Sequence, residues 1–422
     1  MSLEALMANY ETTTITKKYH DAIVDWQKKN FPEMAMLEKH WGDYFKGQPP
    51  FELVAKVGTI KSGTVDVGQY AGRKRFEKAK EMVGNAFFSA RDIIRAQCST
   101  ELGSIQQHRL TLDQSVSDKA KFSVLRIMAE ELRHAYQMFW VLDQDPTWKK
   151  PGMGDVAKQT IEDLLGMELG THVLDAFNID FNDFLDNVTY ATVIDLVGKY
   201  QLEMQQVFSY APMARSMGPM LQEESFHLGS GRSLLKEIAQ MAARDEGDYS
   251  IADVQKALNL WLPRGLEMFG NEHGGETAMT FGFKDKTNGV AQNEYYEEVS
   301  VVVRNINVAI IQERIPDIER ADAHAILDEV ERSGDSIRGI RPEDMILMPD
   351  TRFFRKRGPE DIIFRPYDVR GNLIAEDGKP LSQEGYLKYL STVLPERFID
   401  TREYNKYVNQ MREFYAAIGA QA

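Results

Sequence analysis

Cysteine is almost absent from the chain, which has one, Cys98, in 422 residues. A single thiol excludes an internal disulfide and any cluster held by several cysteines, and its helical surroundings predict a packed core side chain. Long uncharged hydrophobic runs are also absent, since no stretch approaches the roughly 18 residues of a membrane-spanning helix. The opening stretch MSLEALMANYETTT lacks a charged start followed by an apolar core. We therefore expect no signal peptide and a cytoplasmic protein.

Basic residues are outnumbered by acidic ones, 50 to 64, which gives a formal net charge of −14 at pH 7. This imbalance argues against a broad electrostatic grip on nucleic acid or on an anionic membrane surface. Histidine is also scarce, with eight in the chain. Two of these eight, His134 and His227, follow a glutamate at the same spacing.

The repeated pattern is Glu-x-x-His, at 131–134 and again at 224–227, each within a proline-free run of helical periodicity. Side chains three residues apart on a helix lie on one face, so each carboxylate and imidazole point together. An acidic residue precedes the two glutamates by 30 and by 29 residues. A four-helix bundle that holds two metal ions uses this set of residues. The candidate ligands, which are also the candidate catalytic residues, are Glu101, Glu131, His134, Asp195, Glu224 and His227.

The composition predicts about one acid-x-x-His pattern by chance, whereas the chain has two, both on apolar helix faces. Ile127 and Met138 flank the first at helical steps, and Met220 and Leu228 flank the second. Four buried carboxylates are costly unless cations neutralise them. Oxygen and imidazole donors without thiolate favour iron or manganese over structural zinc, and iron suits oxygen chemistry.

The apolar periodicity predicts four long helices that carry these ligands, over about 75–110, 119–143, 181–210 and 219–244. In the first, Val83 is expected on the inner face. Other helical stretches are expected at 16–44 with a break at Pro32, at 154–180, at 250–270 and at 289–313. Residues 47–72 read as an irregular crossing with a small hairpin. From Pro316 onward we expect α+β structure, with a hairpin around 362–374 and a closing helix.

Three further residues are candidates for contact with a ligand or the substrate: Gln97, His108 and Met138. Gln97 precedes Glu101 by one turn, and a plain buried amide is an equal alternative. His108 lies two turns after Glu101, where a hydrogen-bonded core histidine is the more expected role. Glu130 and Glu223, each just before a motif glutamate, are expected as groups outside the ligand shell or on the helix surface.

With these residues placed, the chain resembles the ferritin-like diiron oxygenases that epoxidise aromatic acyl-CoA thioesters. The resemblance, over about 75–280, lies in the two ligand spacings with aspartate at 195 and in these stretches: Thr100-Glu101, Gln106-Gln107-His108 and Glu276-Thr277-Ala278. The expected fold is mainly α: a ferritin-like four-helix bundle with a dimetal centre, extra helices and a small α+β carboxyl-terminal region. We expect an amino-terminal helix and irregular segment over 1–74, the diiron bundle over 75–270, and a carboxyl-terminal helical and α+β extension over 271–422.

The resemblance implies that Glu101, Glu131 and His134 bind one iron and that the other three ligands bind a second. It also implies dioxygen as cosubstrate and electrons from NADPH through a separate reductase. The implied substrate is an aryl-CoA thioester, and the long carboxyl-terminal region favours benzoyl-CoA over phenylacetyl-CoA. The basic clusters 73–75 and 352–357 are candidates for the CoA phosphates. A homo-oligomer is left open.

Two more distant functions share the ligand order. A ribonucleotide reductase small subunit places a radical tyrosine one turn after the first motif histidine, where this chain has Met138, and Tyr136 is expected to point elsewhere. A ferroxidase or iron-storage protein is the second alternative, but storage cages use much shorter chains.

Overall fold

The computed structural model describes residues 10–270 and 272–349, together with 375–376, 379–382, 385, 388 and 409. The chain divides into two compact units. One unit comprises Met1–Leu234 and Asn271–Tyr295, and the other Leu235–Gly270 and Tyr296–Ala422. All six candidate ligands lie in the first unit. The domain boundaries expected from the sequence stay a prediction.

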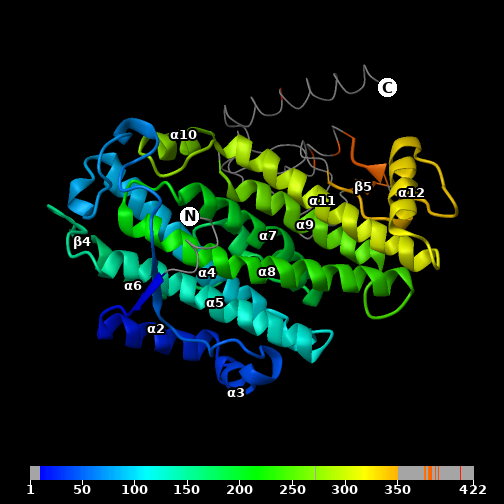
Figure 1. Ribbon diagram of the computed structural model, residues 1–422, viewed down its shortest axis with the longest axis horizontal. Helices are drawn as coiled ribbons and strands as arrows, with labels where there is room; N and C mark the ends of the chain where they lie inside the picture. Colours follow the sequence, from blue (N-terminus) through cyan, green and yellow to red (C-terminus); the bar gives the residue numbers. More distant parts are fainter. Residues whose placement is uncertain are drawn as a thin grey trace. The chain divides into compact units, whose positions relative to one another are not determined.

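The centre of the first unit is built by four long helices: α4 (Asn85–Leu110), α5 (Asp118–Asp143), α7 (Phe184–Gln205) and α8 (Ala211–Ala243) (Figure 1). The short helix η3 (Leu112–Gln114) joins α4 to α5, which pack against each other as an antiparallel pair. Ser117 caps α5 by accepting a hydrogen bond from the backbone N–H of Ala120, which satisfies a donor at the helix start. The mainly α, ferritin-like fold predicted from the sequence is confirmed.

Two of these helices begin elsewhere than the sequence predicts. Helix α4 begins at Asn85, ten residues late, because Gly84 adopts a positive φ of 56° that ends the preceding irregular segment. The expectation that Val83 faces inward is therefore wrong, since this side chain is 66% exposed. Helix α8 begins at Ala211 and continues through Pro219, which was expected to open it. Packing of Gly58 against the Pro219 ring covers that point of the helix.

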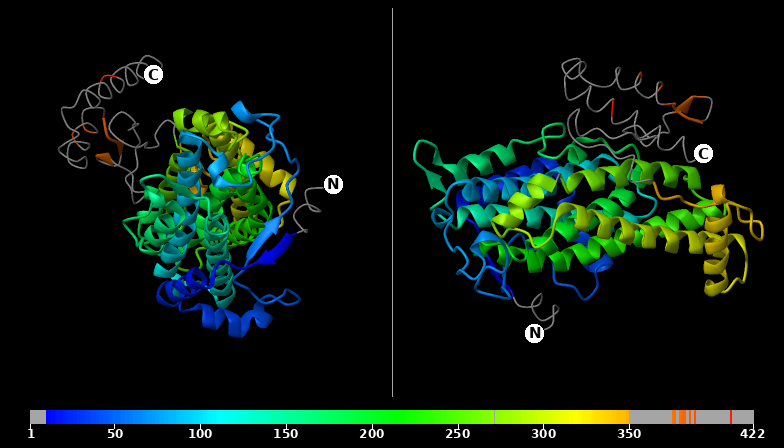
Figure 2. Two further views of the ribbon diagram at one scale, coloured as in Figure 1. Left: turned by 90° about the vertical axis from the view of Figure 1, so that its left-hand side faces the viewer. Right: turned by 90° about the horizontal axis from the view of Figure 1, so that it is seen from above.

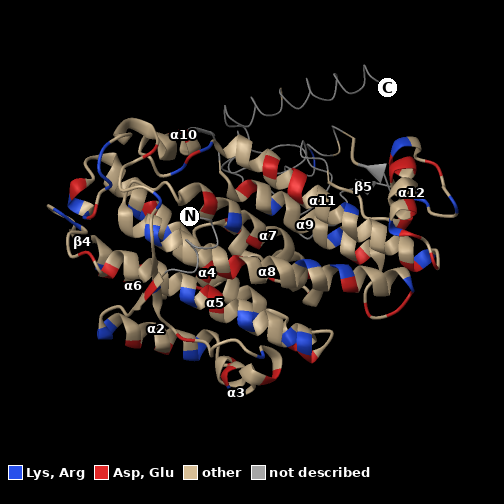
Figure 3. Ribbon diagram, in the orientation of Figure 1, with Lys and Arg blue, Asp and Glu red and all other residues tan. Residues whose placement is uncertain are grey.

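The amino-terminal region lies on the outer side of α5. As predicted, the chain forms two helices on either side of Pro32, α2 (Lys17–Asn30) and α3 (Met34–Tyr44). Helix α3 packs against α5, and α2 and α3 lie along one side of the bundle in Figure 1 and in the left-hand view of Figure 2. Both outer helices carry charged residues of both signs (Figure 3). The small hairpin expected within 47–72 lies at the end of that segment, where Thr64 forms an antiparallel bridge with Lys74 and Val65 hydrogen-bonds with Gly72 and Arg73. In addition, β2 (Ala55–Gly58) pairs antiparallel with β1 (Tyr10–Thr13). The short helices η1 (Gly68–Tyr70) and η2 (Ala79–Glu81) lead from this ribbon to α4.

The segment between α5 and α7 covers α4. It contains the ribbon β3 (Lys149–Lys150) and β4 (Gly154–Asp155), helix α6 (Val156–Leu165) and the short helix η4 (Asp175–Asn178). His172 hydrogen-bonds with Ser99 and Gln106 of α4, and a Cβ added at Gly103 would lie 2.9 Å from Phe177 Cβ. The close packing explains a glycine in the middle of a long helix, where it otherwise lowers stability.

The remaining elements are α9 (Ile251–Met268), α10 (Glu272–Thr280), α11 (Asn288–Arg314), α12 (Arg320–Ser333), η5 (Pro342–Asp344), β5 (Ala375–Glu376) and β6 (Lys379–Pro380). Helix α12 lies where α+β structure was expected, and α10 was not predicted. Within the second unit, α11 and α12 share an apolar core that includes Ile311 and Leu327, and Gly334 ends α12 in the left-handed conformation. The hairpin expected around 362–374 and the closing helix lie outside the described residues. None of the described helices is long and apolar enough to cross a membrane.

Candidate metal centre

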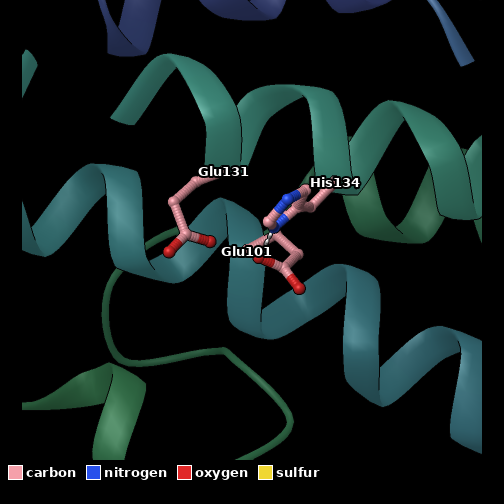
Figure 4. Close-up of side chains that lie close together, drawn as sticks. All are labelled: Glu101, Glu131 and His134. Atoms are coloured by element: carbon pink, nitrogen blue, oxygen red, sulfur yellow. Dashed lines mark ion pairs between the residues drawn. The ribbon is translucent and has the colours of Figure 1, made fainter. Parts of the chain in front are cut away.

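The six candidate ligands meet in the core of the first unit, although they come from four different helices. Two groups of side chains have potential ligand atoms within 4.8 Å of one another: Glu101, Glu131 and His134, and Glu131, Asp195 and His227. Figure 4 shows Glu101 on α4 beside Glu131 and His134 on α5, with the carboxylates and the ring close together. Each of the six residues is at most 5% exposed.

Glu131 and Glu224 occupy the positions between the two groups. Glu131 belongs to both of them. The carboxylate of Glu224 lies 3.7 Å from His134 Nδ1 through one oxygen and 3.4 Å from His227 Nδ1 through the other. The two imidazole rings are 5.7 Å apart between centroids. Glu131 and Glu224 are therefore placed where they could contribute oxygen ligands to both halves of the site.

The electrostatics of the cluster show what four adjacent carboxylates cost without a cation. Burial and the neighbouring carboxylates of Glu101, Asp195 and Glu224 raise the pKa of Glu131 well above its usual range. Burial raises the pKa of Asp195 to about 8, opposed by His227. The pKa of His134 rises to about 9 although burial lowers it, because Glu101 and Glu223 favour the charged ring. Burial therefore favours the protonated, uncharged form of Glu131 and of Asp195 in the metal-free protein.

The donor atoms fit two divalent cations. Within the described part of the chain, both ring nitrogens of His134 and of His227, Oδ2 of Asp195 and Oε2 of Glu224 are buried and have no hydrogen-bond partner. Buried polar atoms without partners are rare in native proteins and call for a ligand, an ion or water. Carboxylate oxygen with imidazole nitrogen is a donor set for iron or manganese.

Two acidic residues outside this set lie close to the Nε2 atoms of the two histidines. Each acid precedes one motif in the chain and contacts the histidine of the other motif. Glu223, which precedes the second motif, places Oε2 3.1 Å from Nε2 of His134 in the first. Glu130, which precedes the first motif, places Oε2 3.2 Å from Nε2 of His227. In the neutral ring that binds a metal, a proton on Nε2 facing the acid would leave the Nδ1 lone pair for a cation at the centre of the cluster. Both acids are buried, so neither is a helix-surface group.

The three additional candidates have distinct surroundings. Gln97 donates from Nε2 to Glu101 Oε1 at 2.5 Å, so it contacts a candidate ligand directly. His108 Nδ1 lies 2.5 Å from Asn187 Oδ1, and burial lowers the pKa of His108 to about 4. Met138 is fully buried on α5.

Two other expectations concern tyrosine and the CoA phosphates. Tyr136 hydroxyl accepts a hydrogen bond from the backbone N–H of Ile15 at 3.1 Å, so it points toward the amino-terminal segment. Arg75 is buried, pairs with Asp66 at 2.8 Å and donates to the Phe208 carbonyl. The guanidinium of Arg75 is therefore already used in an ion pair and in hydrogen bonds within the fold. Its assignment as a phosphate-binding cation is wrong. The basic cluster 352–357 lies outside the described residues.

Sequence reasoning missed the cations that surround the outer acids. Arg126 Nε lies 3.1 Å from Glu130, and Arg133 approaches Glu223 to 2.6 Å. The four-residue spacing of Arg126 and Glu130 was a readable helical ion pair. Lys56, which pairs with Glu223, lies 167 residues away in the chain, and no local pattern indicates that contact.

A mainly α bundle that gathers four carboxylates and two imidazoles in its core has the architecture of the ferritin-like dimetal carboxylate proteins. Residues 154–338, which include Asp195, Glu224 and His227, match the family described as phenylacetic acid catabolic protein. The chain is also 25% identical over 262 residues to benzoyl-CoA oxygenase component B of Aromatoleum evansii. That alignment covers 61% of this chain and 52% of the relative, so the chain spans about half the length of the curated relative it matches. The chain thus resembles the benzoyl-CoA and phenylacetyl-CoA epoxidase proteins, as the sequence motifs predicted.

Proposed function

We propose that this chain is the oxygenase component of a cytoplasmic diiron monooxygenase that epoxidises the aromatic ring of an aryl-CoA thioester, most specifically benzoyl-CoA, in aerobic aromatic degradation. The observation that carries the proposal is the convergence of six buried ligand side chains from four helices. The similarity to a benzoyl-CoA oxygenase component supports the substrate class. That relative is named component B, which supports a separate partner, and we propose a reductase that delivers electrons from NADPH.

The proposed roles of the residues follow from their positions. Glu101 and His134 would hold one iron and Asp195 and His227 the other, with Glu131 and Glu224 between them. A diiron centre supplies the activation of dioxygen that an electron-poor aromatic ring requires. The chain itself keeps water away by burying all six side chains, and Gln97 orients Glu101 by a hydrogen bond.

Phenylacetyl-CoA is the second candidate substrate, and the match of residues 154–338 to the phenylacetic acid catabolic family favours it. Ribonucleotide reduction and ferroxidase activity are more distant alternatives. The hydroxyl of Tyr136 hydrogen-bonds with the backbone of Ile15, in the amino-terminal segment, which argues against ribonucleotide reduction.

The test combines metal analysis with a substrate assay. After anaerobic reconstitution, the full chain should hold about two iron ions, as this bundle type does. With reductase, NADPH and dioxygen, it should convert benzoyl-CoA to an epoxide faster than phenylacetyl-CoA. The reverse preference would shift the proposal to the second substrate, and absence of bound iron would refute it.

A matched pair of histidine variants separates the site from general damage. His134→Ala should abolish turnover while the helical circular dichroism stays, because the substitution leaves the buried apolar side chains of α4, α5, α7 and α8 unchanged. His40→Ala removes a histidine that is partly exposed and pairs with Asp43 outside the cluster, so its turnover should match that of the unchanged protein.

A further inference from the structure

We propose that Lys56, on strand β2 outside the helical bundle, is a positioning residue for the metal centre, acting with Arg133 through Glu223 on His134. The inference rests on the proposed function insofar as it needs metal at the cluster. It assigns a role to the amino-terminal ribbon, for which the sequence suggested none.

The carboxylate of Glu223 contacts two cations, Lys56 and Arg133, and the ring of His134. Oε1 pairs with the Lys56 ammonium and, at 2.6 Å, with the Arg133 guanidinium. Oε2 accepts from Arg133 Nε at 3.1 Å and faces His134 Nε2, also at 3.1 Å. Arg133 thus contacts both oxygens of Glu223, Lys56 adds a second cation at Oε1, and Oε2 faces the ring of His134. Charged, buried hydrogen bonds of this kind set orientation strongly.

Strand β2 is hydrogen-bonded to α5 close to His134, and this contact fixes the backbone position of Lys56. The backbone N–H of Lys56 donates to Gln137 Oε1 at 2.7 Å, and Gln137 lies one turn after His134 on α5. Gln137 in turn donates to Ser216 on α8 at 2.9 Å. The Lys56 ammonium also lies 4.9 Å from the centre of the Tyr10 ring, on the paired strand β1. A cation over an aromatic face gains further attraction there.

The other half of the cluster is held differently. Glu130, which faces His227, pairs with Arg126 of its own helix at 3.1 Å, and that guanidinium stacks on Phe226 at 3.7 Å. Among the described residues, the ribbon supplies a cation to the ion pairs of Glu223 and none to those of Glu130. The two metal positions should therefore respond unequally to a change in the ribbon.

Lys56 is also reachable from solvent. Its side chain is 17% exposed and lines a cavity of about 470 Å³ that reaches Glu130 and Glu223. Tyr10, Phe51 and Trp41 supply aromatic walls to this cavity. A substitution at Lys56 can thus be accommodated without opening the apolar bundle core, so metal binding is separable from folding.

The expected effect on metal affinity follows from the restraint that Lys56 places on the Glu223 carboxylate. Without Lys56, Glu223 keeps Arg133 as its one cationic partner among the described residues, and the carboxylate can shift with that side chain relative to His134. Removing a partner that contacts a metal-bound histidine typically lowers metal affinity about 10- to 100-fold. Lys56 acts one contact further out, so we expect a loss at the lower end, about tenfold, at one of two sites.

The experiment titrates Co²⁺ into the metal-free full chain and follows visible absorption and calorimetry. Lys56→Met should weaken one Co²⁺ site about tenfold and alter its absorption band, while the metal-free chain keeps a single cooperative melting transition. Lys56→Arg should restore both. Lys46→Met removes an exposed lysine of the neighbouring loop and should behave like the unchanged chain.

The possible results separate failure of this inference from failure of the proposed function. Two unchanged Co²⁺ sites in Lys56→Met would overturn the inference, as would equal weakening of both sites with a lower melting temperature. Lys56→Gln repeats the test if the methionine variant does not fold. If the unchanged chain itself binds no metal, the proposed function fails; if it binds two ions and Lys56→Met matches it, only the role of Lys56 fails.

Discussion

Replacing Asp195 by asparagine should stabilise the metal-free protein at neutral pH while it weakens metal binding. Burial raises the pKa of Asp195 to about 8, with Glu224 and Glu101 raising it and His227 opposing them. In the unfolded chain the carboxyl ionises near its ordinary value of 3.8. Asparagine resembles the protonated acid in shape and has no charge to bury.

The sign follows from proton linkage. Between about pH 4 and 8 the folded, metal-free protein binds a proton at Asp195 that the unfolded chain has released, so stability falls as pH rises through this window. Each pH unit costs about 1.4 kcal/mol. From the ordinary pKa to pH 7 the cost reaches about 4 kcal/mol at most, and about 2–4 kcal/mol after allowing for an imperfectly paired amide.

Urea unfolding in the presence of a chelator measures this difference. At pH 7, Asp195→Asn should unfold at higher urea than the unchanged chain, and at pH 4 this gain should vanish, so that the variant unfolds at the same or slightly lower urea. With saturating Co²⁺ the order should reverse, because a ligand that binds only the folded state stabilises it. Asp92→Asn, at a side chain that is 58% exposed, is the control and should shift neither curve. A destabilised Asp195→Asn at pH 7, or a gain that is the same at pH 4, would refute the reasoning.

Three further predictions test other parts of the structure. Chelation of a metal-loaded sample should lower its melting temperature, and re-addition of Co²⁺ should restore it; an unchanged melting temperature would mean that no metal is held by the folded state. Glu130→Gln should weaken metal binding about 10- to 100-fold by loosening His227, measured by the same titration, and wild-type affinity would contradict the role given to this acid. Gly103→Ala should destabilise the protein by about 1–3 kcal/mol in urea unfolding, because the added Cβ would meet Phe177 at 2.9 Å. Its control, Gly42→Ala, adds a Cβ with no neighbour within 4 Å and should be neutral or slightly stabilising.

The amino-acid sequence alone determined the helices and the faces of the helices on which the candidate ligands lie. Helical periodicity and a three-residue spacing are local properties, so Glu131 and His134 could be placed together before any fold was known. The break at Pro32 was equally local, because proline cannot donate the backbone hydrogen bond of a helix interior, although α8 continues through Pro219. The assignment of the six residues to iron stays a prediction.

The residues that contact the candidate ligands from outside the cluster were decided by the tertiary structure. The crossing of Glu223 to His134 and the contact of Lys56 with Glu223 join residues 89 and 167 positions apart, and nothing in either neighbourhood encodes the partner. The pairing of β1 with β2 and the late start of α4 have the same origin. Strand pairing and helix ends of this kind depend on which surfaces remain free once the bundle has packed. The free energy that stabilises them comes from contacts between residues distant in the chain.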